Sequence, residues 1–151
     1  MKASILLLAG LAIGLTSQAQ AQTIGGFPRG EKSTADNHVG DVWLSELAPA
    51  DSTFQYSVAM ATFAKGAYLD WHKHPGGQIL LITQGVGYYQ ERGKARRTVH
   101  QGEVIKCSPG VEHWHGAAAT STMTYLATTP AQKGKTIWLK RLTAAEYAGS
   151  N

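Results

Sequence analysis

Cysteine is nearly absent from this sequence, whose 151 residues include a single one, Cys107. No disulfide can therefore form within the chain, and the fold must be held by a packed core and by contacts with other molecules. We expect Cys107 to be a structural thiol inside a strand, because free cysteine usually packs as a small apolar side chain.

Strong charge of either sign is also lacking. The formal net charge is +4. Such a weak basic bias predicts no nucleic-acid partner, since nucleic-acid binding needs a dense basic surface. Internal repeats and low-complexity segments are absent as well, which excludes a solenoid or an array of repeated units.

Long apolar runs are confined to the N-terminus. Lys2 precedes an uncharged stretch at 5–15, and residues 19–21 (Ala-Gln-Ala) have the small side chains of a cleavage site. This pattern predicts a secretory signal peptide at 1–21, cleavage before Gln22, and a periplasmic or secreted protein. A short membrane anchor is the alternative. No second apolar run follows, so we expect no membrane association after cleavage.

The rest of the sequence predicts an all-β domain. Residues 22–38 are expected to form an N-terminal arm, and 39–151 a single domain with one core. Short alternating segments between turn signals are typical of a closed β-barrel or jelly roll. The predicted strands are 41–47, 54–64, 68–72, 78–83, 87–90, 97–100, 104–107, 112–115, 123–128 and 137–142. A short C-terminal helix is predicted at 144–147, with Thr143 and Glu146 as its capping box.

One face of the predicted strand 54–64 leaves space inside the barrel. Alternation places Ala59, Ala61 and Phe63 on the same face. Small side chains on one face of a barrel strand leave room for a cavity. We therefore expect an interior that can hold a small molecule.

Four of the six histidines occur in two His-x-His pairs. His72 and His74 form one pair, and His113 and His115 form the other. In an extended strand, residues two apart point to the same side, so each pair presents both imidazoles to one face. The turn at 75–77 (Pro-Gly-Gly) then brings Gln78 back beside the first pair. This arrangement predicts a transition-metal site inside a barrel.

These residues resemble the two motifs of the cupin superfamily. The positions that keep the spacing of the first motif are Gly66, His72, His74, Gln78 and Gly85. Those that match the second are Gly102, Pro109, Gly110 and His113. Three departures are Gln78 for a glutamate, Ser108 for a proline and Ala117 for an asparagine. The resemblance, from about Val39 to Tyr147, implies the cupin double-stranded β-helix, a jelly-roll barrel.

Within the superfamily, the segments around both motifs are similar to small bacterial cupins that are manganese-dependent hydroxynitrile lyases of the (R)-mandelonitrile lyase type. This implies that His72, His74, Gln78 and His113 bind one divalent transition metal, manganese by expectation, with iron, nickel or zinc as alternatives. Four neutral ligands would leave the ion its full charge, which suits a Lewis acid. The alternative is that these histidines only fill the barrel.

His115 and Tyr125 are the candidate catalytic residues. His115 shares the face of His113 and either orients a ligand or substrate or is a core histidine bonded to backbone. Tyr125 stands where the related lyases carry a histidine base. A phenol beside a cation ionises more easily, so Tyr125 is either an inner base or a packing side chain.

The expected function is that of an exported, metal-dependent lyase of the hydroxynitrile lyase type that acts on a small molecule. An iron or nickel dioxygenase and a non-catalytic cupin that binds a metal or small ligand are the alternatives. We also expect a homodimer, because small cupins commonly pair their barrels. The tryptophans are expected on the barrel exterior, against a second subunit or the arm. They are Trp43, Trp71, Trp114 and Trp138.

The leader at 1–21 gives the first testable prediction. Protein collected from the exported fraction should begin at Gln22, either free or cyclised to pyroglutamate. Mass spectrometry of the intact chain and of its N-terminal peptide measures this directly. Exported protein that retains Met1 would contradict the prediction.

Overall fold

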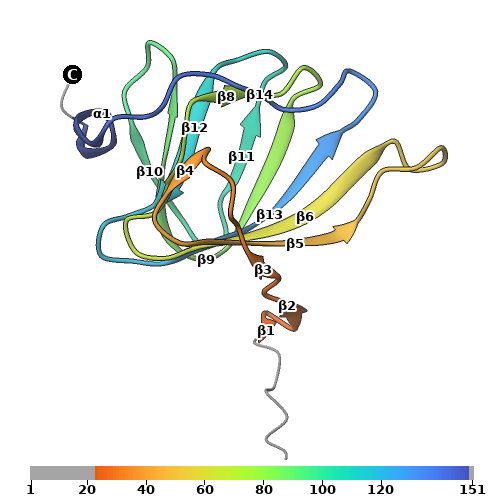
Figure 1. Ribbon diagram of the computed structural model, residues 1–151, viewed down its shortest axis with the longest axis horizontal. Coiled ribbons are helices and arrows are strands. Elements are labelled where there is room, and N and C mark those ends of the chain that lie inside the picture. Colours follow the sequence, from red (N-terminus) through yellow and green to blue (C-terminus); the bar gives the residue numbers. More distant parts are fainter. Residues whose placement is uncertain (1–22, 150–151) are drawn as a thin grey trace, which may run out of the picture.

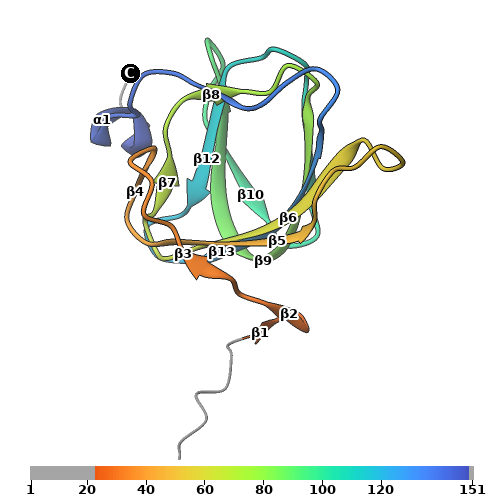
Figure 2. The same cartoon turned by 45° about the vertical axis from the view of Figure 1, so that its right-hand side comes forward.

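The computed structural model describes residues 23–149, and the predicted signal peptide at 1–21 lies outside them. These residues form fourteen strands and one short helix, which confirms the all-β class and the C-terminal helix. Figures 1 and 2 show the strands curled around a common interior, with the first strands extending from one side. No helix in the described part is long and apolar enough to cross a bilayer.

The strands follow one another with short connections. The N-terminal ones are β1 (Thr23–Ile24), β2 (Phe27–Pro28), β3 (Glu31–Lys32) and β4 (His38–Val39). The next are β5 (Val42–Ala48), β6 (Tyr56–Phe63), β7 (Tyr68–Leu69) and β8 (His72–Lys73). The remaining elements are β9 (Gln78–Glu91), β10 (Arg97–His100), β11 (Val104–Cys107), β12 (His113–Ala117), β13 (Met123–Pro130), β14 (Ile137–Trp138) and α1 (Ala144–Ala148).

The long strand β9 belongs to both walls of the barrel. Its first part pairs with β11 and β13, and its second part with β10 and β12. The prediction of two separate strands here, at 78–83 and 87–90, is wrong, because β9 runs through both. Between them Gly85 adopts φ +77, a left-handed conformation that glycine takes without steric cost. The chain thus bends from one wall to the other without leaving the ladder.

The core fills the space between the two walls. Fully buried side chains in this cluster include Phe63, Leu80, Val99, Ile105 and Met123. Cys107 is buried in the same cluster, which confirms its expected structural place in a strand. Buried side chains alternate with exposed ones along β11, as expected of a sheet with one face in the core.

A second apolar cluster lies outside the barrel wall. Trp71 and Trp114 are buried there with Tyr68 and Leu142. Tyr147 of α1 stacks on Tyr68 with ring centroids 4.4 Å apart. The expectation that a second subunit or the arm covers these tryptophans is therefore wrong for Trp71 and Trp114, because the chain's own C-terminal segment covers them.

The predicted strand 137–142 is only two residues long in the structure. Beyond β14, backbone donors bond outside the ladder: the amide of Leu139 donates to the carbonyl of Trp71 at 2.8 Å. The amide of Leu142 donates to the carboxylate of Asp70 at 3.0 Å. The segment therefore crosses the wall as an irregular strap and leads into α1.

Apolar side chains also remain exposed on the outer face of the sheet. Ile79 and Leu81 of β9 and Val104 of β11 are exposed, and Val104 lies opposite Leu81 in the ladder. The homodimer stays a prediction, for which this surface is available.

The capping box of α1 allows a direct test of local stability. The Thr143 hydroxyl accepts from the amide of Glu146 at 3.2 Å, and the Glu146 carboxylate accepts from the amide of Thr143 at 2.9 Å. Thr143→Ala should lower the free energy of unfolding by about 1 kcal/mol, whereas Thr143→Ser should preserve it. Urea titration of the three proteins measures the difference. Equal losses in both variants would show that the cap does not stabilise the fold.

Candidate metal centre

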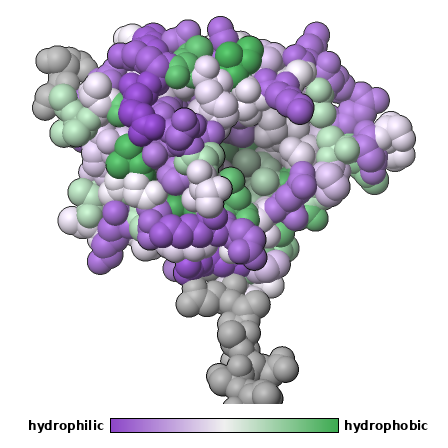
Figure 3. Space-filling view, viewed as in Figure 1, coloured by the Kyte–Doolittle hydropathy of each residue, from purple (hydrophilic) through white to green (hydrophobic). Residues whose placement is uncertain are grey.

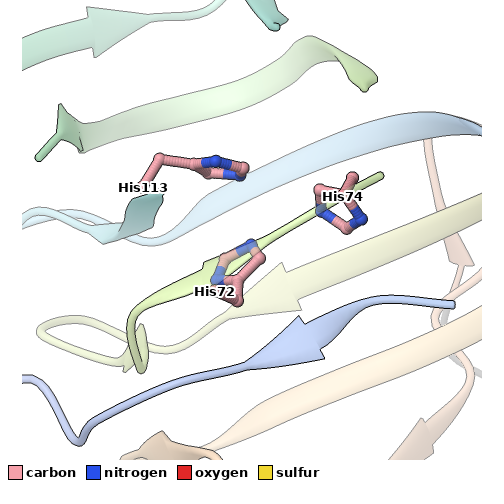
Figure 4. Close-up of side chains that lie close together, drawn as sticks. All are labelled: His72, His74 and His113. Carbon is pink, nitrogen blue, oxygen red and sulfur yellow. The ribbon is translucent and has the colours of Figure 1, made fainter. Parts of the chain in front are cut away.

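The two His-x-His pairs lie on neighbouring strands. β8 pairs with β12 in antiparallel fashion, and His72 stands directly opposite His113 in that ladder. Side chains of directly opposed residues lie on the same face of a sheet, so both imidazoles enter the barrel interior. His74 follows β8 immediately and leaves the chain on the same side as His72 (Figure 4).

Three histidines converge closely enough to hold one ion. One ring nitrogen from each of His72, His74 and His113 lies within 4.8 Å of the others, and all three residues are buried. Figure 4 shows the ring of His113, from β12, near the rings of His72 and His74, which come from one segment. The centre could hold a metal ion through these three imidazoles alone.

The second nitrogen of each ring is already bonded to the protein. The Nδ1 of His72 donates to the carbonyl oxygen of Asp70 at 2.8 Å, and that of His113 donates to the carbonyl of Val111 at 2.9 Å. The Nδ1 of His74 lies 3.1 Å from the hydroxyl of Thr136. Because a carbonyl can only accept, the proton of His72 and His113 sits on Nδ1, which leaves Nε2 with a free lone pair.

Two of the three remaining ring nitrogens are buried without a partner in the protein. The Nε2 atoms of His74 and His113 are buried without a hydrogen bond. An unsatisfied buried polar atom costs about 1–3 kcal/mol, and most such atoms in proteins are paired. Lone pairs that converge from three rings are the donor set of a borderline transition metal, so the residues present fit such an ion.

Gln78 lines the same cavity as His72 and His74 and was predicted to be a fourth ligand. The turn that precedes it closes with a hydrogen bond from the amide of Gly77 to the carbonyl of His74 at 3.0 Å. The side-chain Nε2 of Gln78 donates to the hydroxyl of Thr129 at 2.9 Å, which fixes the orientation of the amide. Its Oε1 is buried and unpartnered. That oxygen is therefore available to an ion.

The imidazoles are held in the neutral form that metal binding requires. Burial lowers the pKa of His72 well below its usual range and that of His74 to about 4, and mutual repulsion with His113 adds to both effects. The pKa of His113 is lowered by burial as well. No proton has to be displaced at neutral pH before an ion binds.

The centre opens into a small cavity of about 200 Å³. His72, His74 and Gln78 lie on its wall, and Ala59 and Ala61 face it from β6. The sequence prediction that small side chains on this strand leave room inside the barrel is confirmed. Figure 3 shows the molecule hollowed on one face, with hydrophobic residues deep in the hollow. A larger recess of about 610 Å³ reaches Gln78 from outside but has none of these histidines on its wall.

His115 and Tyr125 face the same cavity, as the sequence predicts. Their ring centroids are 5.1 Å apart, and both ring nitrogens of His115 are buried without a partner. His115 is therefore not a core histidine bonded to backbone. Burial lowers the pKa of His115 and raises that of the Tyr125 phenol well above its ordinary value. This burial favours the protonated phenol, which can act as a hydrogen-bond donor, and the easier ionisation expected beside a cation stays a prediction.

Sequence reasoning missed two other residues on the cavity wall. Trp138 was expected on the exterior, yet it lines the cavity and its ring centroid lies 4.9 Å from that of His72. His38, from the segment predicted to be an arm, lines the cavity too. A lone histidine in a polar segment carries no spacing signal, so no pattern in the sequence marks it.

Comparison with known proteins identifies relatives of the chain. Residues 59–129 match the family described as Cupin domain. An (R)-mandelonitrile lyase of Granulicella tundricola is 40% identical over 117 residues, which cover 77% of this chain and 89% of that protein. A cupin-like protein of Thermotoga maritima is 39% identical, with a TM-score of 0.78 over 82% of this chain and 95% of its own. A cupin 2 conserved barrel protein of Rhodopseudomonas palustris, 19% identical with a TM-score of 0.60 over 78% of this chain and 77% of its own, shares the fold.

The geometry predicts the effect of removing one imidazole. His113→Ala should weaken the binding of a divalent transition metal by about 10- to 100-fold or more. Loss of a residue that only supports a metal ligand already weakens binding by this factor, so loss of a ligand itself should cost at least as much. The fold should survive, because the barrel has its own core. Elemental analysis after dialysis and a thermal melt measure both properties.

His100→Ala serves as the control, because His100 is an exposed histidine on β10. It should keep the metal content of the unchanged protein. Equal metal content in the His113→Ala variant and the unchanged protein would mean that the ion is held elsewhere.

Proposed function

The chain belongs to the cupin family, and from this membership we propose that it is an exported, metal-dependent lyase that cleaves a small cyanohydrin. The observation that carries the proposal is the set of unpartnered, neutral donor atoms that converge on an apolar cavity. The 40% identity to an (R)-mandelonitrile lyase over most of both chains supports the choice of reaction.

We assign the ion to His72, His74, Gln78 and His113. Manganese is the proposed metal, with iron, nickel and zinc as alternatives. An ion in this site would draw electron density from a hydroxyl or carbonyl oxygen of the substrate. Because no ligand is charged, its positive charge would be undiminished by the protein.

His115 is proposed as the inner base. Its imidazole is neutral, both nitrogens lack a partner, and it lines the cavity beside the ligand set. His115 takes the hydroxyl proton of the cyanohydrin, and the electrons of that bond form the carbonyl. The bond between the carbinol carbon and the nitrile carbon breaks, and its electron pair leaves with cyanide. Return of the proton from His115 to cyanide gives an aldehyde and hydrogen cyanide, so atoms and charge balance.

Tyr125 has a supporting part in this proposal. Burial raises the pKa of its phenol and favours the protonated form, so we assign the role of base to His115. A protonated hydroxyl facing the cavity can instead donate a hydrogen bond to a developing negative charge. This assigns the two residues opposite roles, with His115 accepting and Tyr125 donating.

The cavity supports a compact, largely apolar substrate. Its volume of about 200 Å³ lies below the range of drug-sized pockets. Phe63, Leu69 and Trp138 contribute apolar or aromatic surface to the wall. A cyanohydrin of an aromatic aldehyde has the size and the polarity that such a cavity favours.

The reaction can be tested with racemic mandelonitrile. Protein loaded with manganese should release benzaldehyde faster than buffer does, and His115→Ala should reduce the rate by about 10²- to 10⁴-fold without loss of metal. His100→Ala should retain the full rate. Benzaldehyde absorbance and elemental analysis measure rate and metal content in the same samples.

Other outcomes would select the alternatives. Absence of turnover with manganese, iron, nickel and zinc would refute the lyase. Oxygen consumption by the iron or nickel form with phenolic or diketone substrates would favour a dioxygenase. Full metal occupancy without any turnover would favour a binding protein.

A further inference from the structure

One polar group on the cavity wall has no role in the metal centre or in the proposed proton transfer. His38 comes from β4, in the segment before the barrel, and it lines the same cavity as His72 and His115. It is not among the three histidines that could hold an ion. Its presence in a mostly apolar wall therefore asks for a separate explanation.

The hydrogen bonding of His38 determines which group it can offer. Its Nδ1 lies 3.0 Å from the carbonyl oxygen of Gly40. Since a carbonyl only accepts, the proton of the neutral ring is on Nδ1, and Nε2 is left as an acceptor. That Nε2 is buried and has no partner in the protein. A buried acceptor of this kind is complementary to a hydrogen-bond donor on a ligand.

The position of His38 is fixed relative to the metal centre. In the ladder of β4 with β7, His38 stands opposite Leu69. The amide of Asp70 donates to the carbonyl of the neighbouring Asn37 at 3.0 Å. The carbonyl of Asp70 in turn accepts from the ring of His72. His38 and the metal ligands are thus held by one continuous set of backbone contacts.

We propose that His38 recognises the ring hydroxyl of a phenolic substrate, by accepting its proton in a hydrogen bond at Nε2. The inference rests on the proposed function, in which the reacting hydroxyl is taken by His115 at the centre. An acceptor on the wall that takes no part in the metal site then calls for a second donor on the substrate, separate from the reacting hydroxyl. On an aromatic cyanohydrin held between apolar walls, a phenolic hydroxyl supplies that donor.

The test measures binding of aldehyde products, which need no turnover. The probes are 3- and 4-hydroxybenzaldehyde, with benzaldehyde and the two methoxybenzaldehydes as analogues that lack the donor. Manganese-loaded full-length protein should bind one hydroxybenzaldehyde about 2- to 10-fold more tightly than the analogues, the scale of one neutral hydrogen bond. Calorimetry or ligand-observed NMR gives the dissociation constants.

Two amide variants of His38 distinguish the role of its Nε2 acceptor from that of its Nδ1 donor. His38→Asn can keep a donor near the Gly40 carbonyl but has no atom at the place of Nε2. His38→Gln can reach that place with its amide oxygen. The preference for the hydroxylated probe should disappear in His38→Asn and persist in part in His38→Gln. His100→Asn, at an exposed histidine, should keep the full preference. Metal content and thermal midpoint should match the unchanged protein in all three variants.

The outcomes decide the inference independently of the reaction. Full preference in His38→Asn, no preference in the unchanged protein, or no binding of any probe would each overturn it. A preference that depends on His38, without cyanide release from any cyanohydrin, would remove the proposed reaction and leave the recognition role. Lyase activity without any preference for a phenolic ring would keep the proposed reaction and remove the recognition role of His38.

Discussion

The register between β8 and β12 is the constraint on which the site depends. It places His72 opposite His113, and a shift by one residue would turn one of the two rings out of the interior. The same strand also approaches β7 closely. A Cβ on Gly116 of β12 would stand 2.5 Å from the Cα of Tyr68, so only glycine fits there. The Gly116–Tyr68 pair and the His113–His72 pair are out of step by one residue, so the chain is irregular between β7 and β8.

Burial then determines the chemistry of the rings that this register brings together. Imidazoles packed side by side in an apolar interior lose hydration, and a charge on one of them would repel a charge on the next. Hence the pKa values of His72, His74, His113 and His115 all lie below the ordinary value. The rings are therefore neutral and their lone pairs are free. Without a partner these buried lone pairs are unfavourable, whereas a bound cation would satisfy them.

Much of this could be predicted from the sequence, because it depends on patterns among neighbouring residues. The face of β6 that carries Ala59 and Ala61, the two His-x-His pairs and the capping box at Thr143 each involve residues two or three apart. The failures have a different origin. The continuity of β9 through Gly85 and the covering of Trp114 by the C-terminal segment depend on contacts between distant parts of the chain. A lone histidine such as His38 becomes informative only when the fold shows which wall it reaches.

Asp70 explains why the segments outside the barrel motif belong to the site. This buried residue receives the amide of Leu142 on its carboxylate and the ring of His72 on its carbonyl, and it donates its own amide to Asn37. The C-terminal strap, a proposed metal ligand and the segment that carries His38 therefore meet at one residue. A displacement of that segment would move the carbonyl that orients His72. The segment proposed to recognise the phenolic hydroxyl is thus connected, through the hydrogen bonds of Asp70, to a residue proposed to hold the ion.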